Sequence, residues 1–277
     1  MNASVVRRQV IAYLSLAFGA SIAVAFLLPS SPVAPVVSGG LPVAVLVVLS
    51  VVWGWRAIWT GLGVRRAGLT YWPVAIAVPA GVAALVYAAA VAWGVVDRGH
   101  GLFASLGWGL LLNLALTGVF VLGEEVGWRG FLLPRISRLT GPRRGAVLTG
   151  FLHALVHLPV VIFTTTYNSA GSRWLIVPTT VVTITAAGVL YAWLRDASGS
   201  IWPATLAHAT GNTLVGMITA TAAPGSETTM AYLAGEGGLI TSLGMSAVAV
   251  VILVRARIWR PIGALDRPPV NSIGGAS

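Results

Sequence analysis

The sequence predicts an all-α fold, a polytopic membrane helix bundle of about eight transmembrane helices with both termini inside. Apolar residues make up 57% of the 277 residues and charged residues only 9%, whereas soluble domains contain about 25% charged residues. The mean hydropathy is +0.88. Long apolar runs and an uneven distribution of arginine are the two further observations that predict a multi-pass membrane protein.

Each predicted helix corresponds to one apolar run. A helix needs about 20 residues to cross a hydrocarbon layer of about 30 Å. The runs are apolar on every face, and the alternating segments of an outer-membrane barrel are absent, so helices are favoured over strands even in the valine-rich second run. In chain order the runs lie near 9–28, 41–59, 73–96, 103–123, 145–163, 175–194, 201–218 and 239–255.

Individual runs carry further information. Arg7 and Arg8 precede the first run, as in a signal peptide, but its apolar core is about twice the usual length and no convincing cleavage site follows. We therefore expect an uncleaved anchor. The third and sixth runs contain glycine and proline, and the fourth ends in GEEVGWRGF. The seventh is the weakest span, because His208, Thr210 and Asn212 interrupt it.

The orientation follows from the basic residues, all of which are arginine. With the N-terminus inside, only Arg98 and Arg173 fall in outside loops, which is a strong positive-inside bias and puts the C-terminus inside too. The arginines are spread over every predicted cytoplasmic turn and form no single face. Attraction to anionic membrane lipid therefore accounts for the net charge of +10, and no nucleic-acid partner is expected.

We expect one transmembrane domain over residues 1–260 and a disordered tail over 261–277, which is rich in Pro, Gly and Ser. The absence of cysteine excludes a disulfide framework, a thiol nucleophile and a thiolate metal site. Use of arginine without lysine, together with abundant Ala, Val and Gly, is typical of a high-GC bacterium, so we expect a multi-pass protein of the bacterial plasma membrane.

Two adjacent carboxylates end the fourth run. Glu125 and Arg129 are four residues apart and share a helix face, so an ion pair would reduce the cost of burying them. Glu124 lies about 100° round the helix without that partner, and an unpaired carboxylate in a membrane costs about 2.5–3.5 kcal/mol. Gly123 and Gly127 would let a neighbouring helix approach closely. The alternative is that both carboxylates are hydrated at the membrane interface.

Histidines in two other runs favour a functional site. His153 and His157 lie four residues apart in the fifth run, and His208 and Asn212 lie four apart in the seventh. A single buried histidine is more often a packing group, and His100 in an outside loop is expected to have no role. Polar groups on three helices must all find partners, which favours one polar cavity. We expect it to open toward the cytosol.

These motifs resemble those of the CPBP intramembrane proteases, also called CAAX-protease, bacteriocin-processing or Abi proteins. The resemblance covers a motif-bearing core of about 103–218. The family's second motif is commonly FxxxH, but here the position four before His157 is His153, so His153 could share or replace its role. The matching residues are EExxxR at Glu124, Glu125 and Arg129, the histidine of His157-Leu-Pro, and HxxxN at His208 and Asn212.

The resemblance implies an intramembrane endopeptidase that hydrolyses a membrane-associated peptide or protein. Glu124, assisted by His157, would activate a water as general base. His208 and Asn212 would bind the oxyanion, and the pair of Glu125 with Arg129 would hold the helix terminus and orient Glu124.

A metal cofactor is left open by these residues. Glu124, His157 and His208 could bind a divalent metal such as zinc, and His153 with His157 offers a second two-ligand arrangement. The signature HExxH is absent, because Ala154 follows His153. A mechanism with glutamate and histidine alone also fits.

Two other function classes remain as alternatives, namely a non-catalytic relative that binds a partner in bacteriocin immunity, and a proton-coupled transporter. The substrate of a protease could be a prenylated CAAX-like tail, a bacteriocin leader peptide or a segment of a membrane protein.

Overall fold

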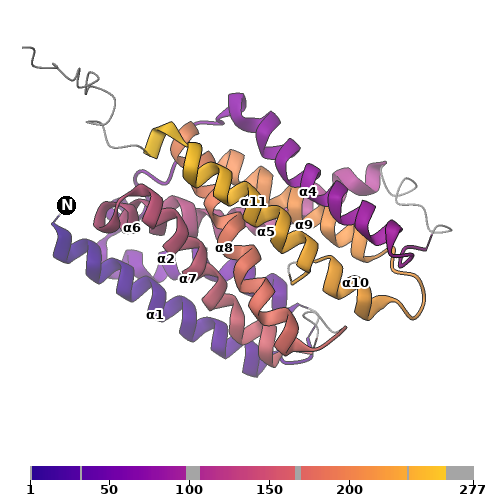
Figure 1. Ribbon diagram of the computed structural model, residues 1–277. Helices are drawn as coiled ribbons and strands as arrows, with labels where there is room; N and C mark the ends of the chain where they lie inside the picture. Colours follow the sequence, from indigo (N-terminus) through magenta and orange to yellow (C-terminus); the bar gives the residue numbers. More distant parts are fainter. Residues whose placement is uncertain (1, 32, 98–106, 166–169, 236, 260–277) are drawn as a thin grey trace, which may run out of the picture.

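A computed structural model describes residues 2–31, 33–97, 107–165, 170–235 and 237–259. Within the described residues, each of the eight predicted apolar runs contains one long helix (Figure 1). The second run is interrupted at Gly54, and the third run extends beyond the end of its helix at Ala92. The predicted tail 261–277 and His100 lie outside the described residues. The long helices are α1 (Ala3–Leu27), α2 (Ala34–Trp53), α4 (Trp72–Ala92), α5 (Trp108–Glu125), α7 (Pro142–Phe163), α8 (Arg173–Ser198), α9 (Trp202–Thr219) and α11 (Leu239–Arg255).

Shorter helices connect the long ones. The described residues contain one isolated β-bridge, between Val96 and Ala222, and no strand. The short elements are α3 (Trp55–Trp59), the 3-10 turns η1 (Leu69–Tyr71) and η4 (Arg257–Trp259), α6 (Leu133–Thr140) and α10 (Glu227–Leu233).

Six helical segments are long and apolar enough to cross a membrane: α1, α2, η1 with α4, α5 through α6, α7 and α8. The helix α11 has only 17 residues, and α9 carries the polar residues that interrupt the seventh predicted run. The prediction of an all-α multi-pass bundle is therefore confirmed, with six candidate spans. The count of about eight and the side of each terminus stay predictions.

The helices pack into two groups around α8. The helices α1, α2 and α7 pack together on one side, α4, α9 and α11 on the other, and α8 contacts α7, α9 and α11. Glycine permits a close crossing of α7 and α8, because a Cβ placed on Gly188 of α8 would lie 2.6 Å from the Cα of Gly150 in α7. The helix α5 contacts α2 and α9, so its polar end faces both groups.

A π-helical segment, η3 (Val126–Leu132), follows α5 directly and leads into α6. All seven of its residues are buried. A Cβ on Gly127 would lie 2.4 Å from the Tyr13 hydroxyl of α1, and a Cβ on Gly123 would lie 3.3 Å from the carbonyl oxygen of Gly39 in α2. Both glycines therefore admit neighbouring helices, as predicted. Single π-helical turns occur often at functional sites.

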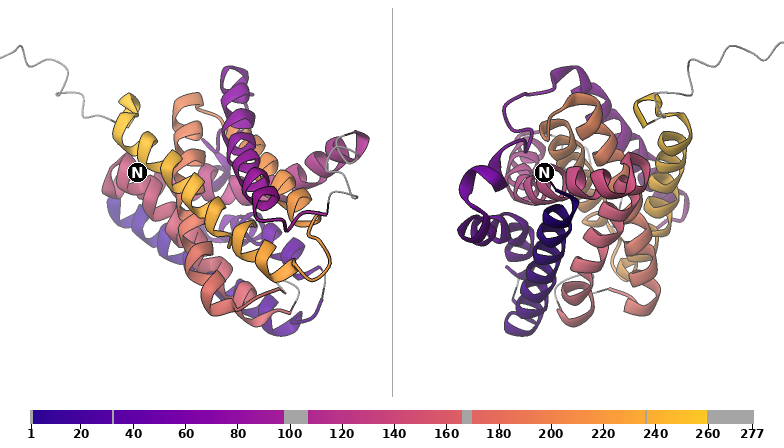
Figure 2. Two further views of the ribbon diagram at one scale, coloured as in Figure 1. Left: turned by 45° about the vertical axis from the view of Figure 1, so that its right-hand side comes forward. Right: turned by 90° about the vertical axis from the view of Figure 1, so that its left-hand side faces the viewer.

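The two ends of the bundle differ in charge. The N-terminus and the end of α11 lie at one end, and α10 lies at the other (Figures 1 and 2). Among the described arginines outside the buried middle of the bundle, Arg173 alone belongs to the end that holds α10. We call one end the arginine-rich end; it is formed by the α2–α4 connection, the α6–α7 turn and the last turns of α8 and α11. We call the other the α10 end; it is formed by the α9–α10 connection and α10.

Candidate active site

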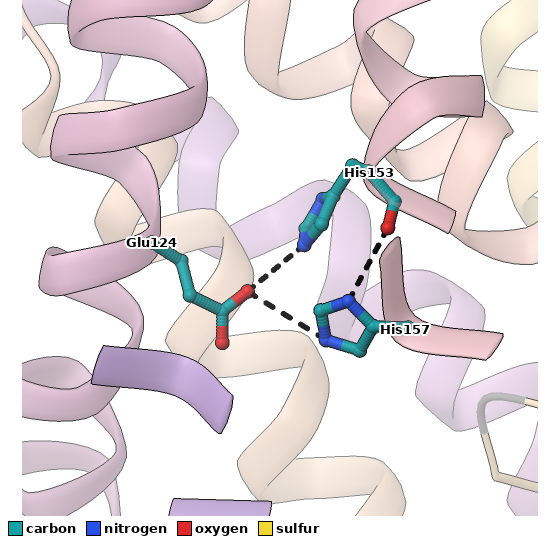
Figure 3. Close-up of side chains that lie close together, drawn as sticks. All are labelled: Glu124, His153 and His157. Carbon is teal, nitrogen blue, oxygen red and sulfur yellow. Dashed lines mark hydrogen bonds and ion pairs between the residues drawn. The ribbon is translucent and has the colours of Figure 1, made fainter. Parts of the chain in front are cut away.

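Glu124 meets two histidines of α7 in the middle of the bundle. Its Oε2 lies 3.0 Å from Nε2 of His153 and 4.0 Å from Nε2 of His157 (Figure 3). Glu124 and His153 are 7% and 3% exposed. The other carboxylate oxygen faces α2, where a Cβ on Gly39 would lie 3.1 Å from it. Glu124 therefore points into the protein and away from lipid.

Glu125 forms a second, fully buried cluster beside the first. Its Oε1 accepts a hydrogen bond of 2.8 Å from Nη1 of Arg129, the predicted ion pair, and it lies 3.0 Å from Nδ1 of His208. Neither Glu125 nor Arg129 has any exposed surface. Gly188 leaves room for the guanidinium, since a Cβ there would lie 3.2 Å from Nη2 of Arg129. Removal of either charge from such a pair would leave the other uncompensated.

The hydrogen-bond partners determine which nitrogen of each histidine carries the proton. Nη1 of Arg129 lies 3.4 Å from Nδ1 of His153, and because a guanidinium has donors only, this Nδ1 must accept. The proton of neutral His153 is then on Nε2, which donates to Glu124. His153 thus holds Glu124 in place and has no free lone pair for a metal while this contact lasts.

His157 and His208 have the opposite arrangement. Nδ1 of His157 lies 3.3 Å from the carbonyl oxygen of His153, and Nδ1 of His208 faces the carboxylate of Glu125. Both partners are acceptors, so each Nδ1 carries a proton and each neutral ring keeps a lone pair on Nε2. Histidines that bind metals usually donate their other N–H to such a partner. These two rings are therefore the candidates for accepting a proton or binding a metal.

One cavity of about 550 Å³ joins the predicted site residues. Glu124, His153, His157, His208 and Asn212 all line it. Within the described part of the chain, the side-chain amide of Asn212 has no hydrogen-bond partner. The structure therefore brings all four predicted catalytic residues to a single space, and Arg129 and Glu125 support it from outside.

The predicted metal ligands are only partly brought together. One ligand atom each from Glu124, His153 and His157 lie within 4.8 Å of one another, a spacing that could hold a metal ion. His208, predicted as the third ligand, is not in this group. Its Nδ1 contacts Glu125 instead.

The cavity reaches the α10 end of the bundle. Its lining continues from Asn212 to Thr219, Ala222 and Glu227, and Glu227 is exposed. The arginine pattern puts this end outside. The predicted opening toward the cytosol and the predicted orientation are therefore incompatible in this structure.

Sequence reasoning missed two aromatic residues of the site. The ring of Trp128 stacks on His153 with centroids 4.6 Å apart, and the ring of Tyr191 stacks on His208 at 5.0 Å. The guanidinium carbon of Arg129 lies 4.9 Å from the Tyr191 ring centroid. Trp128 lies within the EExxxR motif, and Tyr191 is the single aromatic in the stretch TAAGVLYA. Both were visible in the sequence, but only packing shows their contacts.

Comparison with known proteins finds a family match over the part of the chain that contains the site. The sequence model of the family described as type II CAAX prenyl endopeptidase Rce1-like matches residues 103–214. This segment is similar to that family. No protein in a search of curated proteins matches the chain. The Rce1-like segment contains every residue of the two clusters, from Glu124 to Asn212, and the family indicates a protease. The resemblance to CAAX proteases stated from the motifs is thus confirmed.

Proposed function

We propose that this protein is an intramembrane endopeptidase that hydrolyses a peptide bond of a membrane-associated peptide or protein, with Glu124 activating the attacking water. The observation that carries the proposal is the carboxylate of Glu124, held at 3.0 Å by His153 and facing His157 at the base of a cavity. An ionisable side chain at membrane depth is costly to bury, and such residues are by default candidates for function.

The position of Glu124 suits a general base. A water molecule can bridge Oε2 of Glu124 and Nε2 of His157, because both atoms are acceptors and they lie 4.0 Å apart. The carboxylate takes one proton from this water as the oxygen attacks the scissile carbonyl carbon. The same proton can then pass to the amine that leaves. His153 keeps the carboxylate oriented throughout by donating to it.

The developing oxyanion needs donors on the far side of the scissile carbonyl. Asn212 supplies an amide N–H without a charge, and it lines the cavity one helical turn from His208. His208 can donate from Nε2 only as an imidazolium, since its Nδ1 proton faces Glu125. Glu125 would stabilise that positive ring. Preorganised donors of this kind contribute about 2.7–4 kcal/mol each to transition-state stabilisation.

A divalent metal such as zinc is compatible with the donors. By spacing the ligands would be Glu124, His153 and His157. Nε2 of His153 would bind the metal after its proton moved to Nδ1, which would end the contact with Arg129. A bound metal would lower the pKa of a coordinated water and polarise the carbonyl. Metal analysis of the purified protein, with chelation and re-addition, separates the metal-assisted form from the metal-free form. Stoichiometric metal that restores activity would exclude the metal-free form.

The cavity suits an apolar peptide. Pro79, Val82 and Met245 contribute to its walls, and the matching family is described as prenyl endopeptidases. A prenylated tail is therefore one candidate substrate. A leader peptide or a segment of a membrane protein is equally compatible with these walls, since each offers an apolar chain near a peptide bond.

The proposal is tested by comparing membrane peptides from cells that contain the wild-type protein or the Glu124→Gln variant. We expect a set of cleavage products to disappear in the variant. Asp196→Asn is the matched control, because Asp196 is an exposed carboxylate at the arginine-rich end that does not line the cavity. A binding or immunity protein would keep its phenotype in Glu124→Gln, and a proton-coupled carrier would lose uptake with no change in peptides. Either result would overturn the proposal.

A further inference from the structure

The lining of the cavity does not continue to the arginine-rich end of the bundle. Between the two clusters and that end lie core side chains with no exposed surface. Trp128 and Leu133 of the continuous α5–α6 segment, Leu194 of α8 and Ala204 of α9 are each 0% exposed. None of them lines the cavity. A peptide could not reach Glu124 from this side without displacing the core.

Toward the α10 end the lining becomes exposed. Glu124 and His208 at the base are 7% and 6% exposed, whereas Ala222 and Ala231 are partly exposed and Glu227 is exposed. All of them line the same cavity. The route from the bulk phase to the carboxylate therefore begins beside α10.

The distribution of arginine indicates on which side of the membrane the α10 end lies. In the described part of the chain, Arg56, Arg66, Arg138 and Arg255 lie at the arginine-rich end, whereas Arg173 is the arginine of the α10 end. Arginines next to membrane helices are retained on the cytoplasmic side. The α10 end is then the non-cytoplasmic end.

We propose that substrate reaches Glu124 from the non-cytoplasmic face. This inference rests on the proposed function insofar as it names a substrate. The access route itself does not depend on that function. The substrate class is a membrane-bound peptide segment whose scissile bond lies on the non-cytoplasmic side. Its flanking residues are apolar, because Met230, Ala234 and Met245 line the cavity. A cytosolic tail would meet the filled end of the bundle.

The absence of cysteine from the chain makes the test direct. Single cysteines are introduced as Ala222→Cys and Ala231→Cys in the cavity mouth and as Arg138→Cys at the arginine-rich end, where Arg138 is exposed. A membrane-impermeant maleimide is applied to intact cells of a bacterial host and to inverted vesicles, with labelling after denaturation as a measure of protein amount. We expect the two mouth cysteines to be labelled in intact cells and Arg138→Cys only in inverted vesicles.

A second measurement links the mouth to catalysis. Labelling Ala231→Cys with a bulky maleimide should abolish peptide cleavage, whereas labelling Arg138→Cys should leave it unchanged. Access from the non-cytoplasmic face is overturned if the mouth cysteines are labelled only in inverted vesicles, if they are labelled only after denaturation, or if the labelled Ala231→Cys variant still cleaves. Labelling requires no activity, so an inactive protein with the expected pattern would overturn the protease proposal and leave the access route standing.

Discussion

Arg129 and His153 meet between α7 and the π-helical segment, with Nη1 of Arg129 3.4 Å from Nδ1 of His153. The same Nη1 donates to Glu125, so one guanidinium connects the two glutamates of the motif, one directly and one through His153. This connection explains how a residue with no exposed surface can influence the carboxylate at the base of the cavity.

The first prediction concerns this guanidinium. Arg129→Met leaves Glu125 buried without its cationic partner, and breaking a buried pair costs about 3–5 kcal/mol of folding stability. We expect a much lower thermal unfolding temperature in detergent. Arg138→Met, which removes an exposed arginine nearby, should change it little. Equal unfolding temperatures for the two variants would show that the buried pair contributes no stability.

The second prediction separates the two histidines of α7. The amide of His153→Gln can still donate a hydrogen bond to Glu124, whereas His157→Gln loses the Nε2 lone pair that faces the carboxylate. We expect His153→Gln to retain clearly more peptide cleavage than His157→Gln. If the protein contains metal, His157→Gln should lose more of it. The opposite order of residual activity would contradict the placement of the ring proton on Nε2 in His153 and on Nδ1 in His157.

The third prediction concerns Tyr191. Its ring stacks on His208 at an interplanar angle of 21°, and such pairs contribute about 0.5–1.5 kcal/mol. Tyr191→Phe keeps the ring and removes the hydroxyl, so cleavage should be nearly unchanged. Tyr191→Leu removes the ring and should lower kcat, because His208 is less well positioned. A Phe variant as slow as the Leu variant would instead assign the role to the hydroxyl.

The fourth prediction tests the close packing of the π-helical segment. A Cβ on Gly127 would lie 2.4 Å from the Cβ of Pro42 and from the Tyr13 hydroxyl, and overpacking of this kind costs about 1–3 kcal/mol. Gly127→Ala should therefore unfold at a lower temperature. Gly118→Ala is the control, since nothing lies within 4 Å of a Cβ at Gly118 in α5. Equal stability of both variants would mean that α1 and α2 move aside freely.

Much of the fold could be predicted from the sequence, because hydrophobic length determines where helices form in a membrane protein. The spacing of Glu125 and Arg129 also predicted their ion pair, since residues four apart share a helix face. The glycine pair at Gly123 and Gly127 predicted a close helix approach for the same reason. These are local properties of the chain.

The remaining features depend on contacts between helices. Spacing alone shows that His153 and His157 share a face, but not which ring reaches Glu124 first. That choice depends on Trp128, which stacks on His153, and on Arg129, which contacts its Nδ1. The π-helical turn and the filled space below the clusters are likewise products of packing. Helix spacing could therefore indicate which residues form the site. Which histidine lies nearest to Glu124, and toward which end the cavity opens, depends on packing between helices.

Hydrolysis by a water activated at Glu124 is tested most directly by isotope incorporation. A peptide identified by the membrane-peptide comparison is incubated with purified protein in ¹⁸O-labelled water, and the new carboxyl terminus is analysed by mass spectrometry. We predict one ¹⁸O atom in the product of the wild-type protein and no product with Glu124→Gln. Unlabelled product from the wild-type protein, or labelled product at an undiminished rate from Glu124→Gln, would contradict the account.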